Sequence, residues 1–544
     1  MRSSRLTSLV LLGGLLAGGL VLDAADEPTP DTTSSTPAVR AGIAMPAAKP
    51  ASTLSSTWYC AGGTASEGGM ADHVLLIANP SDEPRRATIT PLLGSFAEPP
   101  SAPEDTAEPG ATTTTAGAPT STAPTSTTTT LPPPEPTIVD LPAQSGIDVA
   151  LSDLVDAPVA SAIVEVDGGE IAVEHQITDE REDGGGRATA PCSSTAASEW
   201  SFPWGITARG ARELLVFMNP FPDDATVDIL LATDEGTREP RRLQNLVVRG
   251  RTSLGVFIDD DTRRDHLSAQ VVVGRGRLVV DRIQTFNGTD PTYEGITLGL
   301  GAPTAAEVWI FPDGNVDEGI TEQVVVYNAS EEVAEIDVVV RLDDPDTNGV
   351  PEPFELTIAP NRFSIVNLHD PDPGAGPDVP ERIPKGVGHS IVVESLNGVP
   401  VSAERVVTRS EPNTNLGVSA TLGAPLAAPT WYFPGGGVSS ERETYLTIFN
   451  ASADAIASVD LTALVGGEAV PVEGLQGIEV PAGGRLAIKL SDHVGDGDDL
   501  PVVVSASGPV VVERGLYRVA GRGTSLSMGI PLAVDVLVPD PLSG

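Results

Sequence analysis

The chain has 544 residues, enough for three or four cores at about 150 residues per domain. Its 75 acidic residues outnumber 32 basic ones, which gives a formal net charge of −43 and a pI near 4.2. A surface this acidic repels nucleic acid and anionic membranes, so neither is an expected partner. Hydrophobic residues make up 40% of the chain, which excludes wholesale disorder.

The N-terminus has the pattern of an export signal. Arg2 and Arg5 precede an apolar run from Leu9 to Leu22, and acidic residues follow it. Residues 1–24 are therefore predicted to be a signal peptide or an uncleaved signal anchor, with 6–22 as the membrane contact. The sequence leaves both outcomes open, because its triplet of small residues lies inside the apolar run. Either outcome places the rest of the chain outside the cytoplasm, membrane-anchored or secreted.

Four similar segments follow the leader, and each begins with a tryptophan. An apolar strand then ends at an asparagine, 19 residues after the tryptophan in the last three segments and 21 in the first. A later strand in each segment carries an acidic residue followed by a basic one. These landmarks are Trp58, Trp200, Trp309 and Trp431; Asn79, Asn219, Asn328 and Asn450; and the doublets Glu174-His175, Asp281-Arg282, Glu404-Arg405 and Glu513-Arg514. Recurrence at matching offsets indicates copies of one structural unit.

Each unit consists of short Val, Ile, Leu and Thr runs with alternating polarity, interrupted by Gly, Pro, Asn and Asp. About seven or eight such strands per unit favour an antiparallel sandwich. The predicted fold is all-β, with four tandem antiparallel β-sandwich (Ig-like) repeats after an N-terminal hydrophobic leader helix. A β-propeller is the alternative, but its blades of about 40–50 residues are too short for this period.

The repeats define the predicted domain boundaries. A Pro/Ala/Thr-rich spacer and a Thr/Pro-rich insertion cannot bury a core, so both are predicted to be disordered. The boundaries are 1–24 for the leader, 25–56 for the spacer, 57–195 for repeat 1 with its insertion at 96–136, 196–304 for repeat 2, 305–427 for repeat 3, 428–535 for repeat 4 and 536–544 for a tail.

Cys60 and Cys192 are the two cysteines of the chain. Cys60 lies in the first strand of repeat 1. Cys192 lies eight residues before Trp200, as Gly301 and Gly423 lie before the next two tryptophans. The pair therefore marks the start and end of one unit, which a sandwich can bring together. In an exported protein we expect a disulfide, with two free thiols as the alternative.

Residues 344–355 match the spacing of a calcium-binding loop. Alternating carboxylates and a glycine turn can place six to eight oxygens around a hard cation. The candidate ligands are Asp344, Asp346, Asn348, the carbonyl of Val350, and Glu355. Predicted strands flank the loop in place of the helices of an EF-hand, so a polar hairpin loop is the alternative. No other cofactor is predicted.

The acid-base doublets are predicted to be structural. Neighbouring residues on a strand point to opposite faces, so the two members cannot act on one atom. Pairing with a cross-strand partner or capping a loop is expected instead. The tryptophans are predicted core residues, with stacking on sugars as the alternative. The sequence has no metal-binding histidine spacing, nucleophile elbow, Walker loop or dinucleotide fingerprint, and the chain is predicted not to be an enzyme.

These motifs resemble a family of exported actinobacterial proteins that carry a domain of unknown function. The shared features are Trp followed by Tyr or Phe, strand-final Asn before Pro or Ala, a Pro-x-Gly start to a later strand, and Glu or Asp before Arg. The likeness covers about residues 57–535. Repeat 1 departs from it, because Cys60 and Cys192 replace the Phe and Gly of the other repeats. The resemblance implies no established activity.

The predicted function is that of a non-enzymatic, extracytoplasmic cell-envelope protein that acts as a structural or scaffolding array. A surface adhesin or glycan-binding module, working through hairpin loops, is the alternative. A hydrolase without a recognisable motif is the third. The residues do not specify which envelope protein or glycan would be the partner.

Overall fold

The computed structural model describes residues 44–98, 134–180, 185–290, 292–369, 381–495, 497, 500–519 and 521–539. The predicted leader, most of the Thr/Pro-rich insertion and the end of the predicted tail lie outside these residues. Strands dominate the described chain, and its helices are single turns. None of the helices in the described part has the length and apolar character needed to cross a membrane.

The strands group into four units that follow the predicted repeats. Unit 1 contains β1 (Ser55–Cys60), β2 (Asp72–Asn79), β3 (Arg85–Phe96), β4 (Thr137–Leu141), β5 (Ser145–Ala150), β6 (Val159–Asp167), β7 (Ala172–Asp179) and β8 (Gly186–Pro191). Unit 2 contains β9 (Glu199–Gly205), β10 (Ala211–Asn219), β11 (Ala225–Thr233), β12 (Gly236–Arg238), β13 (Leu246–Val248), β14 (Thr252–Phe257), β15 (Leu267–Arg275), β16 (Val279–Asn287) and β17 (Glu294–Leu300).

Units 3 and 4 repeat this order. Unit 3 contains β18 (Val308–Asn315), β19 (Ile320–Asn328), β20 (Ala334–Leu342), β21 (Phe354–Ile358), β22 (Arg362–Asn367), β23 (Gly388–Ser395), β24 (Ser402–Arg409) and β25 (Asn415–Leu422). Unit 4 contains β26 (Ala428–Phe433), β27 (Arg442–Asn450), β28 (Ala457–Val465), β29 (Glu468–Pro471), β30 (Ile478–Val480), β31 (Arg485–Lys489), β32 (Val502–Arg518), β33 (Gly521–Arg522), β34 (Thr524–Met528) and β35 (Ile530–Pro531). The short helices are η1 (Leu151–Asp153), η2 (Arg241–Leu243), η3 (Ile258–Asp260), α3 (Pro345–Asn348) and η4 (Leu490–Asp492).

Each unit is a sandwich of two layers of antiparallel strands with the same strand order, and a parallel pairing of β3 with β14 joins one layer of unit 1 to one layer of unit 2 in an eight-stranded sheet. In unit 1 the sheets are β1-β6-β3-β4 and β5-β2-β7-β8. In unit 3 they are β18-β23-β20-β21 and β22-β19-β24-β25. In unit 4 the long strand β32 belongs to both sheets, where the other units use two separate strands. The predicted β-sandwich fold is therefore confirmed, and the propeller alternative is wrong because each unit holds its core between two sheets.

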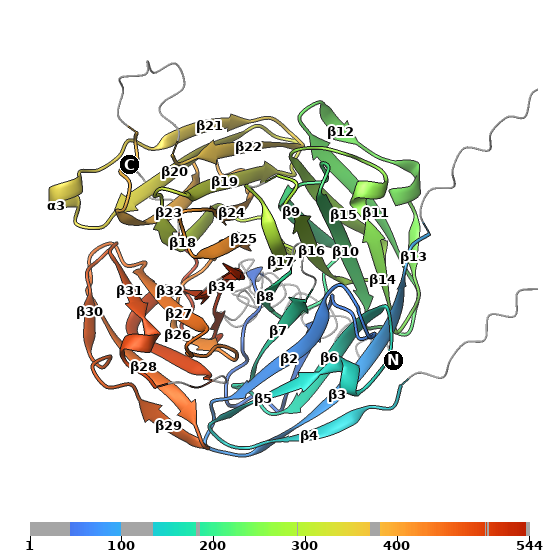
Figure 1. Cartoon of the computed structure of the whole chain (residues 1–544), viewed down its shortest axis with the longest axis horizontal. Helices are drawn as coiled ribbons and strands as arrows, with labels where there is room; N and C mark the ends of the chain where they lie inside the picture. Colours follow the sequence, from blue (N-terminus) through green and yellow to red (C-terminus); the bar gives the residue numbers. More distant parts are fainter. Residues whose placement is uncertain are drawn as a thin grey trace, which may run out of the picture.

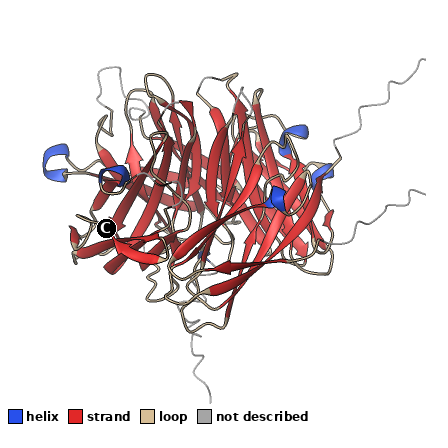
Figure 2. Ribbon diagram, turned by 60° about the horizontal axis from the view of Figure 1, so that its bottom comes forward, coloured by secondary structure: helices blue, strands red, loops and turns tan. Residues whose placement is uncertain are grey.

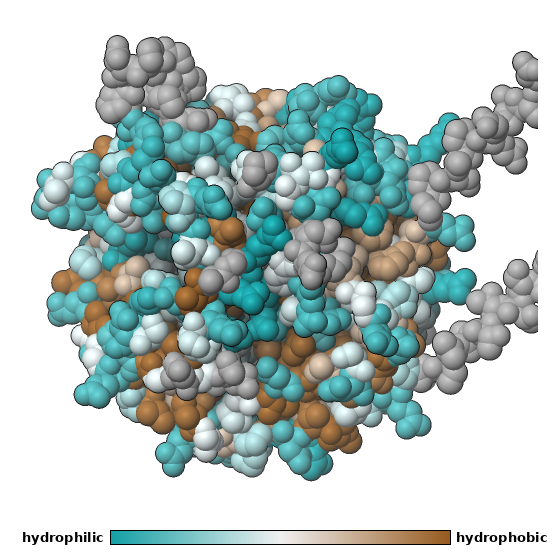
Figure 3. Space-filling view, in the orientation of Figure 1, coloured by the Kyte–Doolittle hydropathy of each residue, from teal (hydrophilic) through white to brown (hydrophobic). Residues whose placement is uncertain are grey.

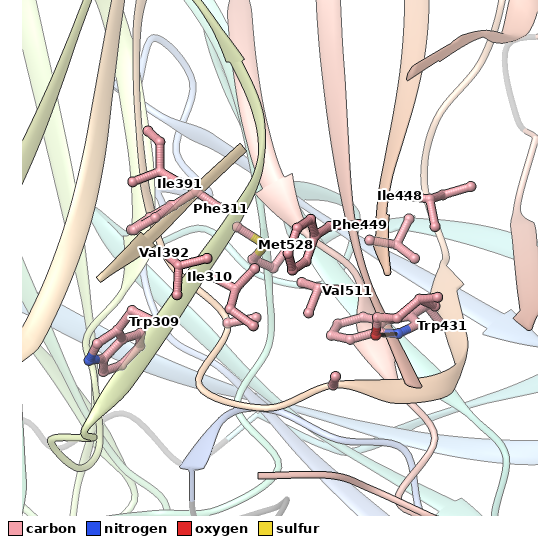
Figure 4. Close-up of a cluster of buried hydrophobic side chains, with 14 of the residues drawn as sticks. Trp309, Ile310, Phe311, Ile391, Val392, Trp431, Ile448, Phe449, Val511 and Met528 are labelled. Atoms are coloured by element: carbon pink, nitrogen blue, oxygen red, sulfur yellow. Dashed lines mark hydrogen bonds between the residues drawn. The ribbon is translucent and has the colours of Figure 1, made fainter. Parts of the chain in front are cut away.

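The predicted landmarks occupy equivalent places in the units. The four opening tryptophans are at most 1% exposed and fill the space between the sheets. Figure 4 shows Trp309 and Trp431 in the cores of units 3 and 4, with Met528 between Phe311 and Phe449. In units 2 to 4 the indole Nε1 donates to a backbone carbonyl three residues before the doublet, that of Leu278, Val401 or Val510. The tryptophans are core residues, because burial leaves no face for a sugar.

The strand-final asparagines are also buried, and they hold a turn together. In each unit the side-chain amide donates to at least two backbone carbonyls, one in the turn that follows and one at the end of a neighbouring strand. For Asn219 these are the carbonyls of Asp223 and Val248, at 2.9 and 3.0 Å. Asn328 and Asn450 bond in the same way. These two asparagines lie in glycosylation-type sequence patterns, but their amides are already used inside the protein.

The four units close into a ring, which Figures 1 and 2 show from two directions. The last long strand of each unit, β8, β17, β25 and β34, lies at the centre of the ring. Strand β8 contacts both β17 and β34, and β25 contacts the same two strands. Side chains join these strands, because Thr189 N donates to Ser525 Oγ and Leu526 N donates to Ser419 Oγ. The sequence predicted the units but not this closure.

Part of the predicted spacer is packed against the units. Residues 44–50 fall in the predicted disordered spacer, but they lie beside the centre of the ring. Met45 is 6% exposed, and Ala48 forms a parallel bridge with Leu532 of unit 4. The backbone carbonyl of Lys49 accepts from the Glu170 amide of unit 1. Small apolar side chains let this segment enter the space between units 1 and 4, so the predicted spacer boundary at residue 56 is too late.

Candidate functional site

The four acid-base doublets lie at the junctions between units, on strands β7, β16, β24 and β32. Because neighbouring residues on a strand point to opposite faces, the basic member faces the following unit and the acidic member faces the preceding one. The resulting pairs are His175 with Asp281, Arg282 with Glu404, Arg405 with Glu513, and Arg514 with Glu174. The last pair joins unit 4 to unit 1, so the pairs form a closed ring. Structural pairing was predicted, but the partner lies in the next unit.

These ion pairs are almost completely shielded from water, with side chains at most 3% exposed. Arg514 donates through Nη1 and Nη2 to the two carboxylate oxygens of Glu174, at 3.0 and 3.1 Å. The backbone amide of Gly435 donates to the same carboxylate at 3.0 Å. Arg282 makes the matching two-pronged contact with Glu404. This geometry compensates much of the desolvation that burial imposes on each charge.

Burial shifts the pKa values of these groups. It raises the pKa of Glu513 to about 7, although the Arg405 guanidinium lowers it. Burial also raises the pKa of Glu174, against the effect of Arg514. For Arg405, burial lowers the pKa, but Glu513 and Glu322 outweigh it and the net shift is upward. The groups are thus strongly coupled, and none is accessible to a substrate.

The first junction differs from the others because a histidine replaces the arginine. His175 Nε2 lies 3.4 Å from an oxygen of Asp281, and His175 Nδ1 lies 2.9 Å from Nε2 of His73. His73 Nδ1 lies 2.9 Å from the carbonyl of Ala160. Burial lowers the pKa of His73 to about 4, lowers that of His175, and raises that of Asp281. Burial therefore favours the uncharged forms of the three side chains at the first junction.

Cys60 and Cys192 form a disulfide, as predicted. Its place in unit 1 is that of a phenylalanine-glycine contact in the other units. The closest ring atom of Phe202 would lie 2.7 Å from a Cβ atom at Gly301, and Phe311 and Phe433 approach Gly423 and Gly529 in the same way. Glycine is needed there because any side chain would overlap the ring. Unit 1 joins the same two strands covalently.

A cavity of about 920 Å³ opens at the fourth junction, between units 4 and 1, beside the starts of the central strands. Its lining includes Arg187 of unit 1 and Arg442, Arg518 and Arg522 of unit 4. Asp179, Glu180 and Glu441 also line it, so the formal charge of the lining is one positive unit in a chain of net charge −43. Figure 3 shows hydrophilic side chains gathered around the centre of one face of the ring.

Apolar clusters fill the corresponding space at the other three junctions. Leu214, Val216 and Ile283 of unit 2 meet Ile177 and Ala188 of unit 1 at the first junction. At the second, Trp204 and Phe286 of unit 2 pack on residues of unit 3, which are Val325, Val406, Val418 and Ala420. At the third, Ile320 and Val407 pack on Tyr517 and Leu526. Among the described residues, polar side chains line this space at the fourth junction, although Tyr432 and Ile530 of unit 4 still pack on the core of unit 1 elsewhere in the same junction.

Equivalent positions show which substitutions open the cavity. The residue eight positions before the strand-final asparagine is Ala71, Ala211 or Ile320 in the first three units, but Arg442 in unit 4. The residue after the doublet is Ile283 or Val406 at the first and second junctions and Gly515 at the third, but Gln176 at the fourth. Five positions before the central glycine or cysteine, Ile296 and Val418 correspond to Arg187. Aligning the repeats position by position could have revealed this site.

The predicted calcium ligands are not gathered around one point. Asp344, Asp346 and Asn348 lie in and beside the single-turn helix α3, where Thr347 Oγ1 donates to Asp344 and Asn348 donates to the carbonyl of Asp343. Val350 is 82% exposed, and Glu355 lies on β21 opposite Asp337. The described residues include no group of three or more His, Cys, Asp or Glu side chains positioned to hold a metal ion. The flanking strands are found as predicted, and calcium binding stays a prediction.

Comparison with known proteins gives a family match without a function. A family of unknown function (DUF5719) matches residues 149–284 and 397–513. Each matched stretch contains one complete junction, from the doublet of one unit to the acidic member of the next. The resemblance to proteins carrying a domain of unknown function is thereby confirmed at that level. No curated protein matches the chain.

Solved structures with local likeness include two small proteins. Thermotoga maritima 1070 is 25% identical with a TM-score of 0.18, and the match covers 22% of this chain and 94% of that one. The Anabaena sensory rhodopsin transducer is 22% identical with a TM-score of 0.15, covering 18% of this chain and 94% of that one. The major pilin of Streptococcus pyogenes is 9% identical with a TM-score of 0.12, covering 85% and 99%.

Proposed function

We propose that the protein is a non-enzymatic, extracytoplasmic scaffold of the cell envelope, whose working part is the closed ring of four β-sandwiches. The observation that carries this proposal is the ring of buried pairs at the doublets. Each pair joins two units, and the pair of Arg514 with Glu174 returns the chain to its start. Such a body holds its surface loops at fixed positions, which suits spacing or assembling other molecules.

Two features favour a location outside the cytoplasm. The first is the export-type leader in the sequence, and the second is the disulfide between Cys60 and Cys192, because disulfides persist in oxidising compartments. An actinobacterial origin, membrane anchoring and secretion all remain part of the proposal. A structural role is also supported by the chemistry of the buried groups, since pairs that are at most 3% exposed cannot reach a substrate.

A second candidate function is that of a glycan-binding module or adhesin. The observation that favours it is the polar cavity at the fourth junction, which combines arginines with Gln176, Thr178 and Ser525. Arginine and amide or hydroxyl side chains are the groups that hydrogen-bond carboxylates and sugar hydroxyls. The two functions are compatible, because a rigid ring can present a binding cavity.

Fractionation of the producing cell into cytoplasm, membrane, wall and medium tests the location, and crosslinking in intact cells tests the scaffold. We expect the protein in the membrane, wall or medium fraction, with reproducible crosslinks to envelope components. A variant with Glu404→Gln, which unbalances the ring, should lose part of those crosslinks at equal protein level. Recovery of the protein in the cytoplasm, or the same crosslinks from an unfolded variant, would contradict the proposal.

A further inference from the structure

We propose that residues 44–50 form a clasp, an extended peptide that lies in a groove between units 1 and 4 and holds the ring closed at the fourth junction. Units 1 and 4 lie at opposite ends of the sequence, so no linker runs from one into the other. At the other three junctions the chain itself joins the two units. The inference concerns how the ring closes, and it stands whether or not the ring acts as a scaffold.

On one side, the clasp adds to unit 4 as a strand. Ala48 N donates to the carbonyl of Pro531, and the carbonyl of Ala48 accepts from the amide of Ala533, each at 2.9 Å. These bonds flank Leu532, with which Ala48 forms a parallel bridge. Addition of an extended segment to a strand edge is a recurring mode of peptide recognition, because the backbone bonds supply affinity. The groove therefore has the chemistry of a peptide site, and the chain fills it with its own residues.

On the other side, a turn of unit 1 holds the clasp. The carbonyl of Lys49 accepts from the amide of Glu170 at 2.7 Å. Gly169 lies directly against the clasp, because a Cβ atom there would overlap the carbonyl oxygen of Pro50. This turn leads into β7, the strand that carries the acidic residue of the fourth junction. The clasp thus connects unit 4 to the part of unit 1 that meets it.

The side chains of the clasp alternate between two cores. Met45 and Ala47 belong to an apolar cluster with residues of units 3 and 4, whereas Ala48 belongs to the cluster of unit 1. Their exposed fractions are 6%, 3% and 0%. Alternation of this kind is typical of a strand, whose successive side chains point to opposite faces. Burial on both faces adds apolar contact to the backbone bonds and favours the closed ring.

The connection between the clasp and β1 is exposed. Ala51 and Ser52 are exposed, and Leu54 is 92% exposed. Exposed connections of this kind are cut by proteases more readily than packed segments. Since the groove supplies the bonds and the buried contacts, we expect the clasp to stay in place after the connection is cut.

Two variants release the clasp from opposite sides. Gly169→Ala places a methyl group against Pro50, and the φ angle at Gly169 lies outside the left-handed region, so alanine adds no backbone strain of its own. Ala48→Pro removes the N–H that bonds to the carbonyl of Pro531. The matched control is Gly508→Ala on β32, where a Cβ atom would have no other atom within 4 Å.

Hydrogen exchange of the full chain, measured by mass spectrometry, reports on the clasp and on the junction. Both variants should speed exchange of the segment around Ala533 about tenfold or more, because its partner Ala48 is released. They should also speed exchange of β8 and β34, which contact each other across the fourth junction. Strands β10 and β16 of unit 2 should exchange as in the wild type, and Gly508→Ala should leave every segment unchanged.

Three results would overturn the proposal. The first is unchanged exchange around Ala533 in both variants, which would mean that the clasp is not its partner. The second is free exchange of the clasp with β8 and β34 as protected as in the wild type, which would mean that the clasp does not close the ring. The third is faster exchange throughout unit 1 in Gly169→Ala without an effect of Ala48→Pro, which would assign the glycine to the turn alone.

Cutting the connection tests the groove itself. A recognition sequence for a specific protease, inserted between Thr53 and Leu54, allows the full chain to be cut once after folding. The fragment that ends in the inserted sequence should co-elute with the ring in gel filtration. Separation of the two parts under native conditions would show that the groove does not bind the clasp. Neither experiment depends on the location of the protein or on its crosslinks in cells, which test the scaffold.

Discussion

Asp281 of unit 2 lies 3.4 Å from His175 of unit 1, at the one junction where an arginine is missing. The hydrogen bonds around this contact determine where its proton sits. His73 Nδ1 faces the Ala160 carbonyl and must donate, so its Nε2 accepts from Nδ1–H of His175. The remaining nitrogen of a neutral His175, Nε2, then carries no proton, and burial raises the pKa of the Asp281 carboxyl that faces it. In the folded protein the proton of this contact is therefore held on Asp281, and both histidines are neutral.

This arrangement makes the stability depend on pH. Burial lowers the pKa of His73 to about 4 and also lowers that of His175, whereas it raises that of Asp281. Between pH 6.5 and 4 the unfolded chain binds protons on both histidines, and the folded junction keeps one on Asp281. Unfolding therefore takes up about one proton, and stability falls as the pH drops through this window.

We expect a loss of about 3 kcal/mol between pH 6.5 and 4, measured by urea unfolding at several pH values. The variant His73→Gln should be less stable at pH 6.5 but should show a shallower pH dependence. An unchanged slope in this variant would show that the acid sensitivity originates elsewhere.

The buried carboxyl of Glu213 is expected to make the stability of the protein fall as the pH rises toward 8. Burial raises its pKa to about 8, against the effect of Arg282, and neither carboxylate oxygen has a hydrogen-bond partner among the described residues. The folded protein therefore holds a proton on Glu213 that the unfolded chain releases above pH 4.5. Stability contributed by this proton is lost as the pH rises toward 8.

Glu213→Gln is an uncharged mimic of the protonated acid. At pH 8 it should be more stable than the wild type by roughly 4 kcal/mol, and the difference should shrink toward pH 5. Urea unfolding of the two proteins at both pH values measures it. Equal stabilities at pH 8 would mean that Glu213 is already ionised without penalty in the folded ring.

Glu404→Gln tests the ion pairs between units. The substitution leaves Arg282 buried without its carboxylate, so we expect a loss of about 3–5 kcal/mol in the free energy of unfolding. Replacing both partners, with Arg282→Met and Glu404→Met, should recover most of that loss because no charge remains buried. The matched control is Arg238→Ala, which breaks an exposed pair with Glu235 and should change stability by less than about 1 kcal/mol. Comparable effects for the two single variants would contradict the assignment of Arg282 and Glu404 to a buried junction.

The disulfide can be exchanged for the contact that the other units use. Removing it with Cys60→Ser and Cys192→Ser should lower stability by about 4–5 kcal/mol in the chain-entropy model, because it closes a loop of 132 residues. Cys60→Phe together with Cys192→Gly should lose less, because Phe202 and Gly301 pack in this way in unit 2.

Cys60→Phe alone should be the worst variant, since the ring would meet a side chain at position 192. Thermal unfolding with and without reductant ranks these proteins. If the Phe–Gly double variant is no better than the double serine variant, the two positions are not equivalent across units.

Much of the fold could be predicted from recurring residues. The period of the repeats, the alternation of apolar residues and the tryptophan positions indicated four sandwiches, because each unit must fill the same interior. The paired cysteines could also be predicted from their positions at the two ends of a unit. The recurrence of the doublet, as in Glu513 and Arg514, indicates copies of one structural unit. It does not indicate which neighbouring unit each side chain contacts.

The closure of the ring and the cavity were not predicted. Closure depends on how each unit is oriented relative to the one before it, which residue patterns do not encode. The residue pattern indicates that the two doublet residues point to opposite faces of a strand. That Arg405 and Glu404 reach different units follows only when the units lie side by side. The segment around Met45 has a spacer-like composition, and the bridge partner of Ala48, Leu532, lies nearly 500 residues further along the chain, so its packing could not be predicted.

The head-to-tail pattern of the doublets is complete only when the ring is closed. Each unit contributes an acidic residue to the neighbour before it and a basic residue to the neighbour after it, and every residue has its partner when the fourth unit meets the first. Removing or inserting one unit would change the curvature that the ring needs in order to close. One acidic and one basic residue would then be buried without a partner. A substitution inside a unit, such as the two cysteines of unit 1, leaves this closure intact, whereas a change in the number of units does not.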